Sequence, residues 1–192
     1  MKAVILVEPE IPENTGFTAR LADNYDAELR VVNPDFQLDE ARKTATNAQQ
    51  KLRDTKIYEN LEEAVKDLEQ VIGTKPGRGL PVEKFQPREN TSVIIGRESS
   101  GLSNKELDMC DAVVHIDLPG YSSMNQSHAA AVLMHELSSS PEERSLSTEQ
   151  KKAIGKILGD GKIKELLLRA SPTSQEYDRL MGELKKLGEK QP

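Results

Sequence analysis

The chain has 192 residues, of which 36% are apolar and 30% are charged, a polar balance for a globular domain. Its 26 Lys and Arg residues are outnumbered by 32 Asp and Glu, which gives a net charge of −6. Any contact with nucleic acid must therefore come from a local basic patch rather than from bulk charge. The single cysteine, Cys110, excludes a disulfide framework and a cysteine-based metal cage, and 4% aromatic residues argue against a stacking platform for single-stranded bases.

Membrane and metal signals are weak. The longest uncharged apolar run, Ala129 to Met134, is far shorter than the roughly 20 residues of a membrane span. The chain begins with Met-Lys and continues directly into a strand pattern, so we expect no signal peptide. Three histidines, which are His115, His128 and His135, offer little for a zinc site. These features predict a soluble cytoplasmic protein without a metal.

Strand and helix patterns alternate through the first 140 residues. Short apolar runs such as Val4 to Val7 and Val93 to Ile95 are typical of buried strands. In chain order, the predicted strands are 2–7, 28–32, 57–58, 70–73, 92–96 and 112–116. The predicted helices are 15–24, two short ones within 38–52, 61–68 capped by Asn60, 103–108 and 124–137. The alternation predicts an α/β fold with a mostly parallel sheet covered by helices on both faces.

The composition changes after Leu137. Residues 138–143 are Ser-rich and contain a proline, which is typical of a linker, and the remainder is patterned as helices with breaks at 159–161 and 171–172. We therefore predict a first domain at 1–140 and a helical C-terminal extension at 141–192. The extension holds 11 Lys and Arg against 9 Asp and Glu, so its net charge is +2 beside −8 in the first domain. This favours contact with a polyanion, and the alternative is a solvated helical hairpin that packs on a partner.

Three loops hold candidate chemistry, and each follows a predicted strand, where open α/β sheets bind their ligands. The first contains Asn14, Gly16 and Arg20, for which a helix cap and a surface cation are the plain alternative. The second, residues 96–102, brackets Glu98 with two glycines but has neither the phosphate-loop ending nor the dinucleotide spacing, and an ordinary strand-to-helix turn fits it equally well. The third, residues 118–127, brings hydroxyls and amides to a helix start, which suits an anion or simply caps the helix.

Together, in this order, the loops resemble the three motifs of the SpoU branch of the SPOUT RNA 2′-O-methyltransferases. Pro12-Glu13-Asn14-Thr15-Gly16 through Arg20 is similar to the first motif, Gly96-Arg97-Glu98-Ser99-Ser100-Gly101-Leu102 to the second, and Ser122-Ser123-Met124-Asn125 to the third. The resemblance covers about residues 1–138 and is strongest to the TrmJ-type tRNA methyltransferases. One departure is the loop after Gly73-Thr74, where Lys75-Pro76-Gly77-Arg78 replaces the small residue and arginines typical of that group.

The resemblance implies an α/β fold with a deep C-terminal trefoil knot, S-adenosylmethionine bound in the knot largely through backbone groups, and a homodimer with its sites at the subunit interface. The implied catalytic residues are Arg20, Asn14, Glu98, Ser123 and Asn125. The implied cofactor-binding residues are Thr74, Ile95, Gly96, Arg97, Glu98, Ile116, Leu118, Met124 and Asn125. Arg20 is either the base that the family proposal makes it or a grip on the adjacent phosphate, with Ser123 as a second phosphate or ribose contact.

The implied reaction is in-line attack of a tRNA ribose 2′-hydroxyl on the sulfonium methyl, at position 32 of the anticodon loop by analogy. It needs no metal, because no phosphoryl group is cleaved. In the same chemistry the alternatives are a wobble ribose, a D-loop guanosine or ribosomal RNA. A different class of function is an RNA-binding module without catalysis. A dehydrogenase or kinase is disfavoured because its phosphate-binding loop is missing.

Overall fold

The computed structural model describes residues 1–88, 90–138, 152–153, 156 and 177–182. The chain divides into one unit of Met1–Ser138 and a second of Ser139–Pro192. The predicted extension at 141–192 lies outside the described residues except for the short pieces named above, which are helical. The fold below is therefore that of the first unit.

A seven-stranded parallel sheet forms the centre of this unit, as the sequence predicts. Its strands lie in the order β3-β2-β1-β6-β4-β7-β5. In chain order they are β1 (Ala3–Val7), β2 (Glu28–Val32), β3 (Lys56–Tyr58), β4 (Gln70–Thr74), β5 (Leu80–Pro81), β6 (Thr91–Ile95) and β7 (Ala112–His115). The two-residue β5 is an addition to the predicted strands. It contains Pro81, and it lies at the edge of the sheet, where a proline does not break a ladder on both sides.

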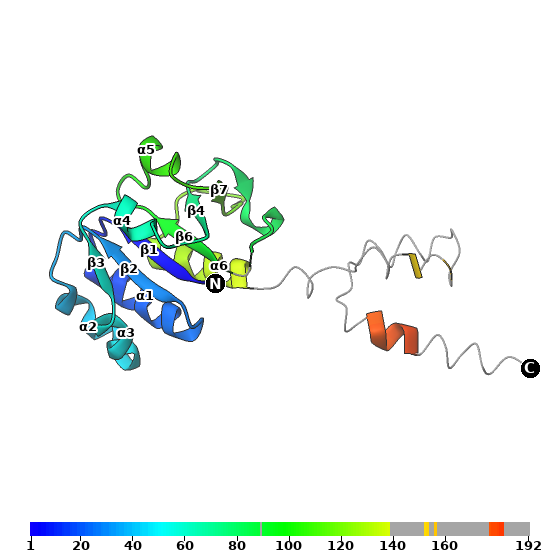
Figure 1. Cartoon of the computed structure of the whole chain (residues 1–192), viewed down its shortest axis with the longest axis horizontal. Helices are drawn as coiled ribbons and strands as arrows, with labels where there is room; N and C mark the ends of the chain where they lie inside the picture. The colour runs from blue at the N-terminus through cyan, green and yellow to red at the C-terminus, as the bar shows by residue number, and fades with distance from the viewer. Residues whose placement is uncertain (89, 139–151, 154–155, 157–176, 183–192) are drawn as a thin grey trace, which may run out of the picture. The chain divides into compact units, whose positions relative to one another are not determined.

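Helices cover both faces of the sheet (Figure 1). They are α1 (Pro12–Asn24), α2 (Arg42–Ala45), α3 (Gln49–Arg53), α4 (Leu61–Val65), α5 (Asn104–Leu107) and α6 (Gln126–Ser138). Along β1, Val4 and Leu6 face the layer that contains α1 and α6, whereas Ile5 and Val7 face α4 and α5. Both sets are buried, because a parallel sheet between two helical layers needs apolar residues on each side of every central strand.

Helix α1 begins three residues earlier than predicted. Its cap position is Ile11, which provides no side-chain hydrogen bond, and Pro12 occupies the first turn, where its fixed φ fits a helix. The interpretation of Asn14 as the cap is therefore wrong. Asn14 lies inside the first turn, and its amide is left to bond elsewhere.

The predicted starts of α4 and α5 are confirmed to within one residue, whereas α6 begins at Gln126, two residues later than predicted. Asn60 caps α4 by accepting a hydrogen bond from the backbone of Glu63 at 2.9 Å, and Ser103 and Glu106 form a capping box on α5. The segment predicted as two short helices holds α2 and α3, with 3₁₀ turns at Leu38–Ala41 and Thr46–Ala48. The ends of the predicted strands and helices lie within a few residues of the observed ends.

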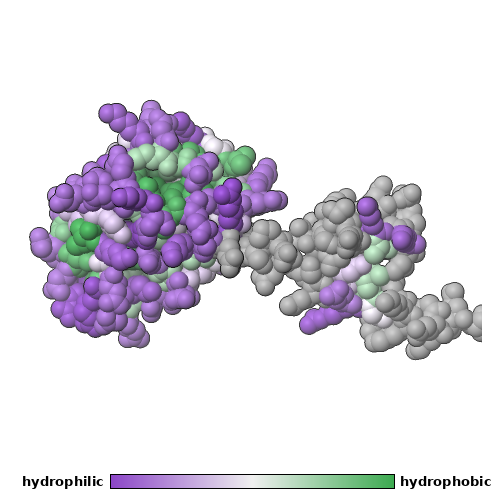
Figure 2. Space-filling view, in the orientation of Figure 1, coloured by the Kyte–Doolittle hydropathy of each residue, from purple (hydrophilic) through white to green (hydrophobic). Residues whose placement is uncertain are grey.

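The apolar residues of this polar chain are concentrated in the core. Figure 2 shows hydrophilic side chains over most of the visible face of this unit, with small apolar areas between them. The large hydrophobic residues that remain exposed are Ile11, Phe17, Ile57, Leu80 and Tyr121. Two of these, Ile11 and Phe17, lie at the cap and on the body of α1, beside the candidate site.

Candidate active site

The three loops singled out in the sequence meet at one edge of the sheet. They follow β1, β6 and β7, and the strands of a parallel sheet all end on the same side. β1 and β6 are hydrogen-bonded neighbours, so the loop that leads to Asn14 lies directly beside the loop that contains Glu98. The site therefore brings the first loop together with two loops that lie more than eighty residues further along the chain.

A hydrogen-bonded chain joins one residue of each motif. The Asn14 Nδ2 donates to Glu98 Oε1 at 3.0 Å, and the Asn125 Nδ2 donates to Asn14 Oδ1 at 3.0 Å. The Asn125 Oδ1 in turn accepts from the backbone N–H and the hydroxyl of Ser127 at 2.9 and 2.8 Å. Because Asn14 is only 4% exposed, its amide is held in one orientation by partners at both ends.

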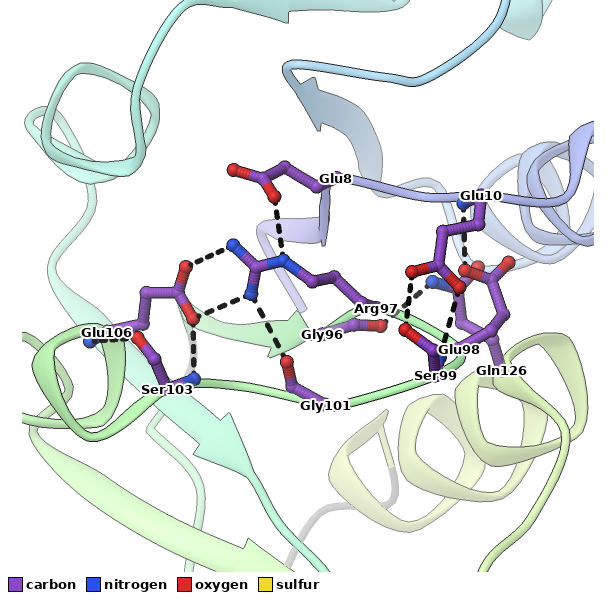
Figure 3. Close-up of polar contacts among 10 residues, drawn as sticks. All are labelled: Glu8, Glu10, Gly96, Arg97, Glu98, Ser99, Gly101, Ser103, Glu106 and Gln126. Carbon is purple, nitrogen blue, oxygen red and sulfur yellow. Dashed lines mark hydrogen bonds and ion pairs between the residues drawn. The ribbon is translucent and has the colours of Figure 1, made fainter.

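Glu98 and Glu10 form a reciprocal pair between the loops after β1 and β6 (Figure 3). The Glu98 carboxylate accepts from the backbone N–H groups of Glu10 and Ile11 at 2.9 and 3.2 Å. The Glu10 carboxylate accepts from the backbone N–H of Ser99 at 3.1 Å and from its hydroxyl at 2.5 Å. Each loop thus contributes a carboxylate to the backbone of the other.

Arg97 turns to the other side of the same loop (Figure 3). Its guanidinium pairs with Glu8 at 2.7 Å and with Glu106 of α5 at 2.9 Å. The hydrogen bonds that Arg97 donates, first to Glu106 and then to Glu8, raise the pKa of Arg97. Burial by itself would raise the pKa of Glu106, but the hydrogen bonds from Arg97 and Ser103 outweigh it, and the pKa of Glu106 lies below its ordinary value. The group at the centre of this cluster is therefore a fixed cation between two carboxylates.

Arg20 lies outside this network. It is exposed on α1 and, among the residues that the structure describes, makes no hydrogen bond or ion pair. It lines a cavity of about 270 Å³ between α1 and α6, whose lining residues are Phe17, Arg20, Leu21, Asn24, Ser127, His128 and Ala131. A guanidinium with five unused donors on the rim of a cavity is suited to grip an anion.

The remaining predicted residues lie at the ends of three neighbouring strands. Ile95 is buried at the end of β6, and Thr74 ends β4, where its hydroxyl donates to the carbonyl of Ile94 at 3.0 Å. Ile116, Leu118 and Met124 are half-buried in the segment after β7, and Ser123 is exposed without a hydrogen bond in the described part of the chain. Gly96 has no room for a side chain, because a Cβ would lie 2.2 Å from the carbonyl carbon of Gly101.

The loop after β4 that departs from the resemblance packs against the loop after β6 and against α5. The Lys75 Nζ donates to the carbonyl of Leu102 at 3.0 Å, and Arg78 donates to the Asn104 side chain at 2.8 Å. Gly79 has a φ of 81° and approaches Val113 so closely that a Cβ would lie 1.9 Å from its carbonyl oxygen. Both cations of this loop are thus used inside the fold.

Residues 1–135 match the SpoU rRNA Methylase family. The chain belongs to this family. A tRNA (cytidine-2′-O-)-methyltransferase TrmJ from Methanocaldococcus jannaschii is 36% identical over 154 residues, which are 71% of this chain and 67% of that relative. The crystal structure of TrmJ from Z. mobilis ZM4 has a TM-score of 0.65 at 25% identity, over 97% of this chain and 99% of that one. The SpoU methyltransferase AviRb from Streptomyces viridochromogenes, solved in complex with AdoMet, has a TM-score of 0.64 at 24% identity, over 71% of this chain and 58% of that one, a likeness of fold.

Two residues of this SpoU chain were missed in the sequence. Gln126 is buried at the start of α6 and donates from Nε2 to the carbonyl of Gly96 at 2.9 Å, while its Oε1 has no partner within the described part of the chain. Glu10 was passed over although it holds Ser99. A glutamine that directly precedes an Ala-rich apolar helix is a recognisable signal, because a polar residue there must find a buried partner. Glu10 offers no such signal, since its partner is 89 residues away.

Metal and membrane features are absent from the described residues of this SpoU chain. Within those residues, no cluster of three or more His, Cys, Asp or Glu side chains could hold a metal ion. None of the helices described there is long and apolar enough to cross a membrane.

Proposed function

We propose that this chain is an S-adenosylmethionine-dependent tRNA ribose 2′-O-methyltransferase that acts in the anticodon loop, at position 32. Its membership of the SpoU family and its similarity to a relative named as a tRNA 2′-O-methyltransferase support the proposal. The structural observation that carries it is the chain Glu98–Asn14–Asn125, which joins all three motif loops, and Arg20 nearby has no side-chain partner among the described residues. A scaffold that only binds RNA has no need of an amide fixed at both ends.

The residues after β4, β6 and β7 fit S-adenosylmethionine. The half-buried apolar side chains of Ile116, Leu118 and Met124 suit an adenosine, and backbone groups at these strand ends suit its polar edges. We propose the binding set Thr74, Ile95, Gly96, Arg97, Glu98, Ile116, Leu118, Met124 and Asn125. When bound, this cofactor supplies a methyl group on a sulfonium that is already a good leaving group.

The protein's own contribution is to position the ribose. Asn14 uses one Nδ2 hydrogen for Glu98 and one lone pair of Oδ1 for Asn125, so a second hydrogen and a second lone pair remain for a ribose hydroxyl. Asn125 keeps this amide in place from the loop that also borders the cofactor. Orientation of this kind can contribute roughly 7–11 kcal/mol to a reaction between two groups.

Arg20 and Ser123 hold the phosphate next to that ribose. A guanidinium stays protonated in proteins, so we assign Arg20 to a bidentate grip on the phosphate rather than to removal of the hydroxyl proton. Ser123, which has no hydrogen bond among the described residues, is the second phosphate or ribose contact. Because the attacking group is a 2′-hydroxyl, the substrate is RNA and not DNA.

We further propose the family's homodimer. Phe17 is 42% exposed where it lines the cavity between α1 and α6, and Ile11 at the start of α1 is 41% exposed; exposed apolar residues of this kind favour burial against a second copy. Sedimentation of the full chain should give a dimer. A stable monomer with full activity would contradict the proposed homodimer but not the proposed methyl transfer.

The domain division and the knot are also proposals. We assign methyl transfer to residues 1–140 and tRNA engagement to a helical extension at 141–192, in a cytoplasmic protein. The chain passes from β6 across β4 to β7 and returns to α6 beside β6, a path that supports a trefoil knot in the segment after β6.

The decisive experiment incubates the full chain with isotope-labelled S-adenosylmethionine and total tRNA, then maps the methylated nucleotide. We expect label in tRNA and a ribose at position 32 that resists alkaline cleavage. Label at position 34 or in ribosomal RNA would retain the chemistry and change the target. Cofactor binding without transfer to any RNA would contradict the proposed function.

A further inference from the structure

The turn between β6 and α5 has a fixed shape of its own. The backbone N–H of Gly101 donates to the carbonyl of Arg97 at 2.9 Å, and Gly96 packs so tightly against Gly101 that no side chain fits between them. This backbone hydrogen bond fixes the shape of the turn. The orientation of the turn toward the neighbouring loops depends on side-chain contacts. Figure 3 shows side chains that leave the turn on two opposite sides.

Arg97 fixes the turn on the side that faces away from Asn14. Its Nε donates to Glu8, its Nη1 and Nη2 donate to the two carboxylate oxygens of Glu106 at 3.1 and 2.9 Å, and Nη1 also donates to the carbonyl of Gly101 at 3.2 Å. Four of the five N–H donors of the guanidinium are used. The Arg97 side chain is only 19% exposed. Because only one N–H donor remains unused, the guanidinium has little left to offer a ligand.

Glu8 has an unfavourable backbone conformation where it contacts Arg97. Its φ is 43°, in the left-handed region that disfavours residues other than glycine. In this conformation its backbone N–H donates to the carbonyl of Val32 at 2.8 Å and its carboxylate reaches Arg97 at 2.7 Å. A strained residue persists where surrounding contacts hold it, and such residues concentrate at functional sites.

From this arrangement we infer that Arg97 is a positioning residue for cofactor binding. Its side chain ties the turn after β6 to Glu8 in the loop after β1 and to Glu106 on α5, while only its backbone lies where the cofactor is bound. The inference rests on the proposed function, which places S-adenosylmethionine at the ends of β4, β6 and β7. It follows that the acidic partner Glu8, which is outside the proposed cofactor-binding set, controls cofactor affinity through Arg97.

The test measures S-adenosylmethionine affinity by calorimetry on the full chain, without RNA. Arg97→Ala is expected to weaken the affinity about tenfold, a typical coupling for contacting groups, with Glu8→Gln and Arg97→Lys weakened less. The double variant Glu8→Gln with Arg97→Ala should bind no more weakly than Arg97→Ala alone, because both changes remove the same contact. In steady-state assays with saturating tRNA, Arg97→Ala and Glu8→Gln should raise KM for the cofactor by a larger factor than they lower kcat.

A matched control breaks a different buried arginine pair. Arg30 on β2 is fully buried against Asp67, and neither residue lies at the motif loops. Asp67→Asn should lower thermal stability and leave cofactor affinity unchanged.

Three outcomes would overturn the inference. If Arg97→Ala loses affinity while Glu8→Gln does not, the guanidinium contacts the cofactor itself. If the Arg97 and Glu8 variants only lose stability, as Asp67→Asn does, their pairing is structural. If the unaltered chain binds no S-adenosylmethionine, the proposed function fails, and this inference fails with it.

Discussion

Replacing Glu98 by Gln tests the network that carries the proposed function. The Glu98 carboxylate accepts three hydrogen bonds, at 2.9 Å from Glu10, 3.2 Å from Ile11 and 3.0 Å from Asn14. Glutamine has the same shape but only one oxygen, so its amide nitrogen must face at least one of these N–H donors. Either Glu10 or Asn14 then loses its acceptor and meets a second donor.

The magnitude follows from the loss of a hydrogen bond to a charged group, which is worth about 1.5–3 kcal/mol. The bonds to Glu10 and Ile11 are exposed, so we take the lower part of that range, about 1.5–2 kcal/mol. If this energy is needed to hold Asn14 in the transition state, the rate of methyl transfer falls by roughly 10–30-fold.

Single-turnover methyl transfer with saturating tRNA and cofactor is the assay. Glu69→Gln is the matched control, because Glu69 accepts from the amide of Asn90 at 3.0 Å on the exposed surface. The double variant Glu98→Gln with Asn14→Ala should be no slower than Asn14→Ala alone. A Glu98→Gln protein that turns over within twofold of the unaltered chain would refute the reasoning.

Other predictions test other parts of the chain. Arg20→Ala should abolish methylation with cofactor binding intact, and Arg20→Lys should also lose most activity because lysine lacks the planar fork; near-normal turnover of the alanine variant would remove the assigned role. Asn125→Ala should weaken cofactor binding in calorimetry more than tRNA binding, and unchanged cofactor affinity would leave Asn125 a purely structural or catalytic role. The hydrogen bond from Arg30 lowers the pKa of Asp67 to about 2, so the stability that this pair adds should be present above the ordinary pKa of an aspartate and lost as pH falls from about 4 to 2. Asp67→Asn should flatten that limb of the acid unfolding curve, and an unchanged acid limb would show that the 64% exposed carboxylate is too well solvated to matter. Deletion of 141–192 should leave cofactor binding near normal and reduce both tRNA affinity and its salt dependence, whereas a truncated dimer with an unchanged salt slope would rule out a role in tRNA binding.

Local pattern was sufficient for six of the seven strands and for the covering helices, but it did not predict the two-residue β5. The strands centred on Ile5 and Ile94 are apolar on both faces, and that property alone predicts a parallel sheet between two helical layers. Caps that depend on neighbours in sequence, such as Asn60 with Glu63, were equally predictable. These features depend on residues within one element, so a single sequence contains all the information that they need.

Long-range partners were beyond such reasoning. Asparagine is a residue type that commonly caps helices. The Asn14 amide instead donates to Glu98, 84 residues away, and nothing local in the sequence predicts that contact. Arg30 lies between apolar residues of β2 and finds Asp67 across 37 residues. In both cases the decisive contact is made by tertiary packing, which overrides the local preference.

The four carboxylates around the site all accept hydrogen bonds from groups within the fold. Glu10 and Glu98 each accept from the backbone of the opposite loop, and Glu8 and Glu106 are paired with Arg97. These carboxylates thus accept hydrogen bonds inside the fold, and one of the donors, Arg97, is a cation. The neighbouring cation Arg20, by contrast, has no partner in the described part of the chain. Although the net charge of the chain is −6, the donors left free at this edge thus belong to a cation, and a local cation is what contact with an RNA phosphate requires.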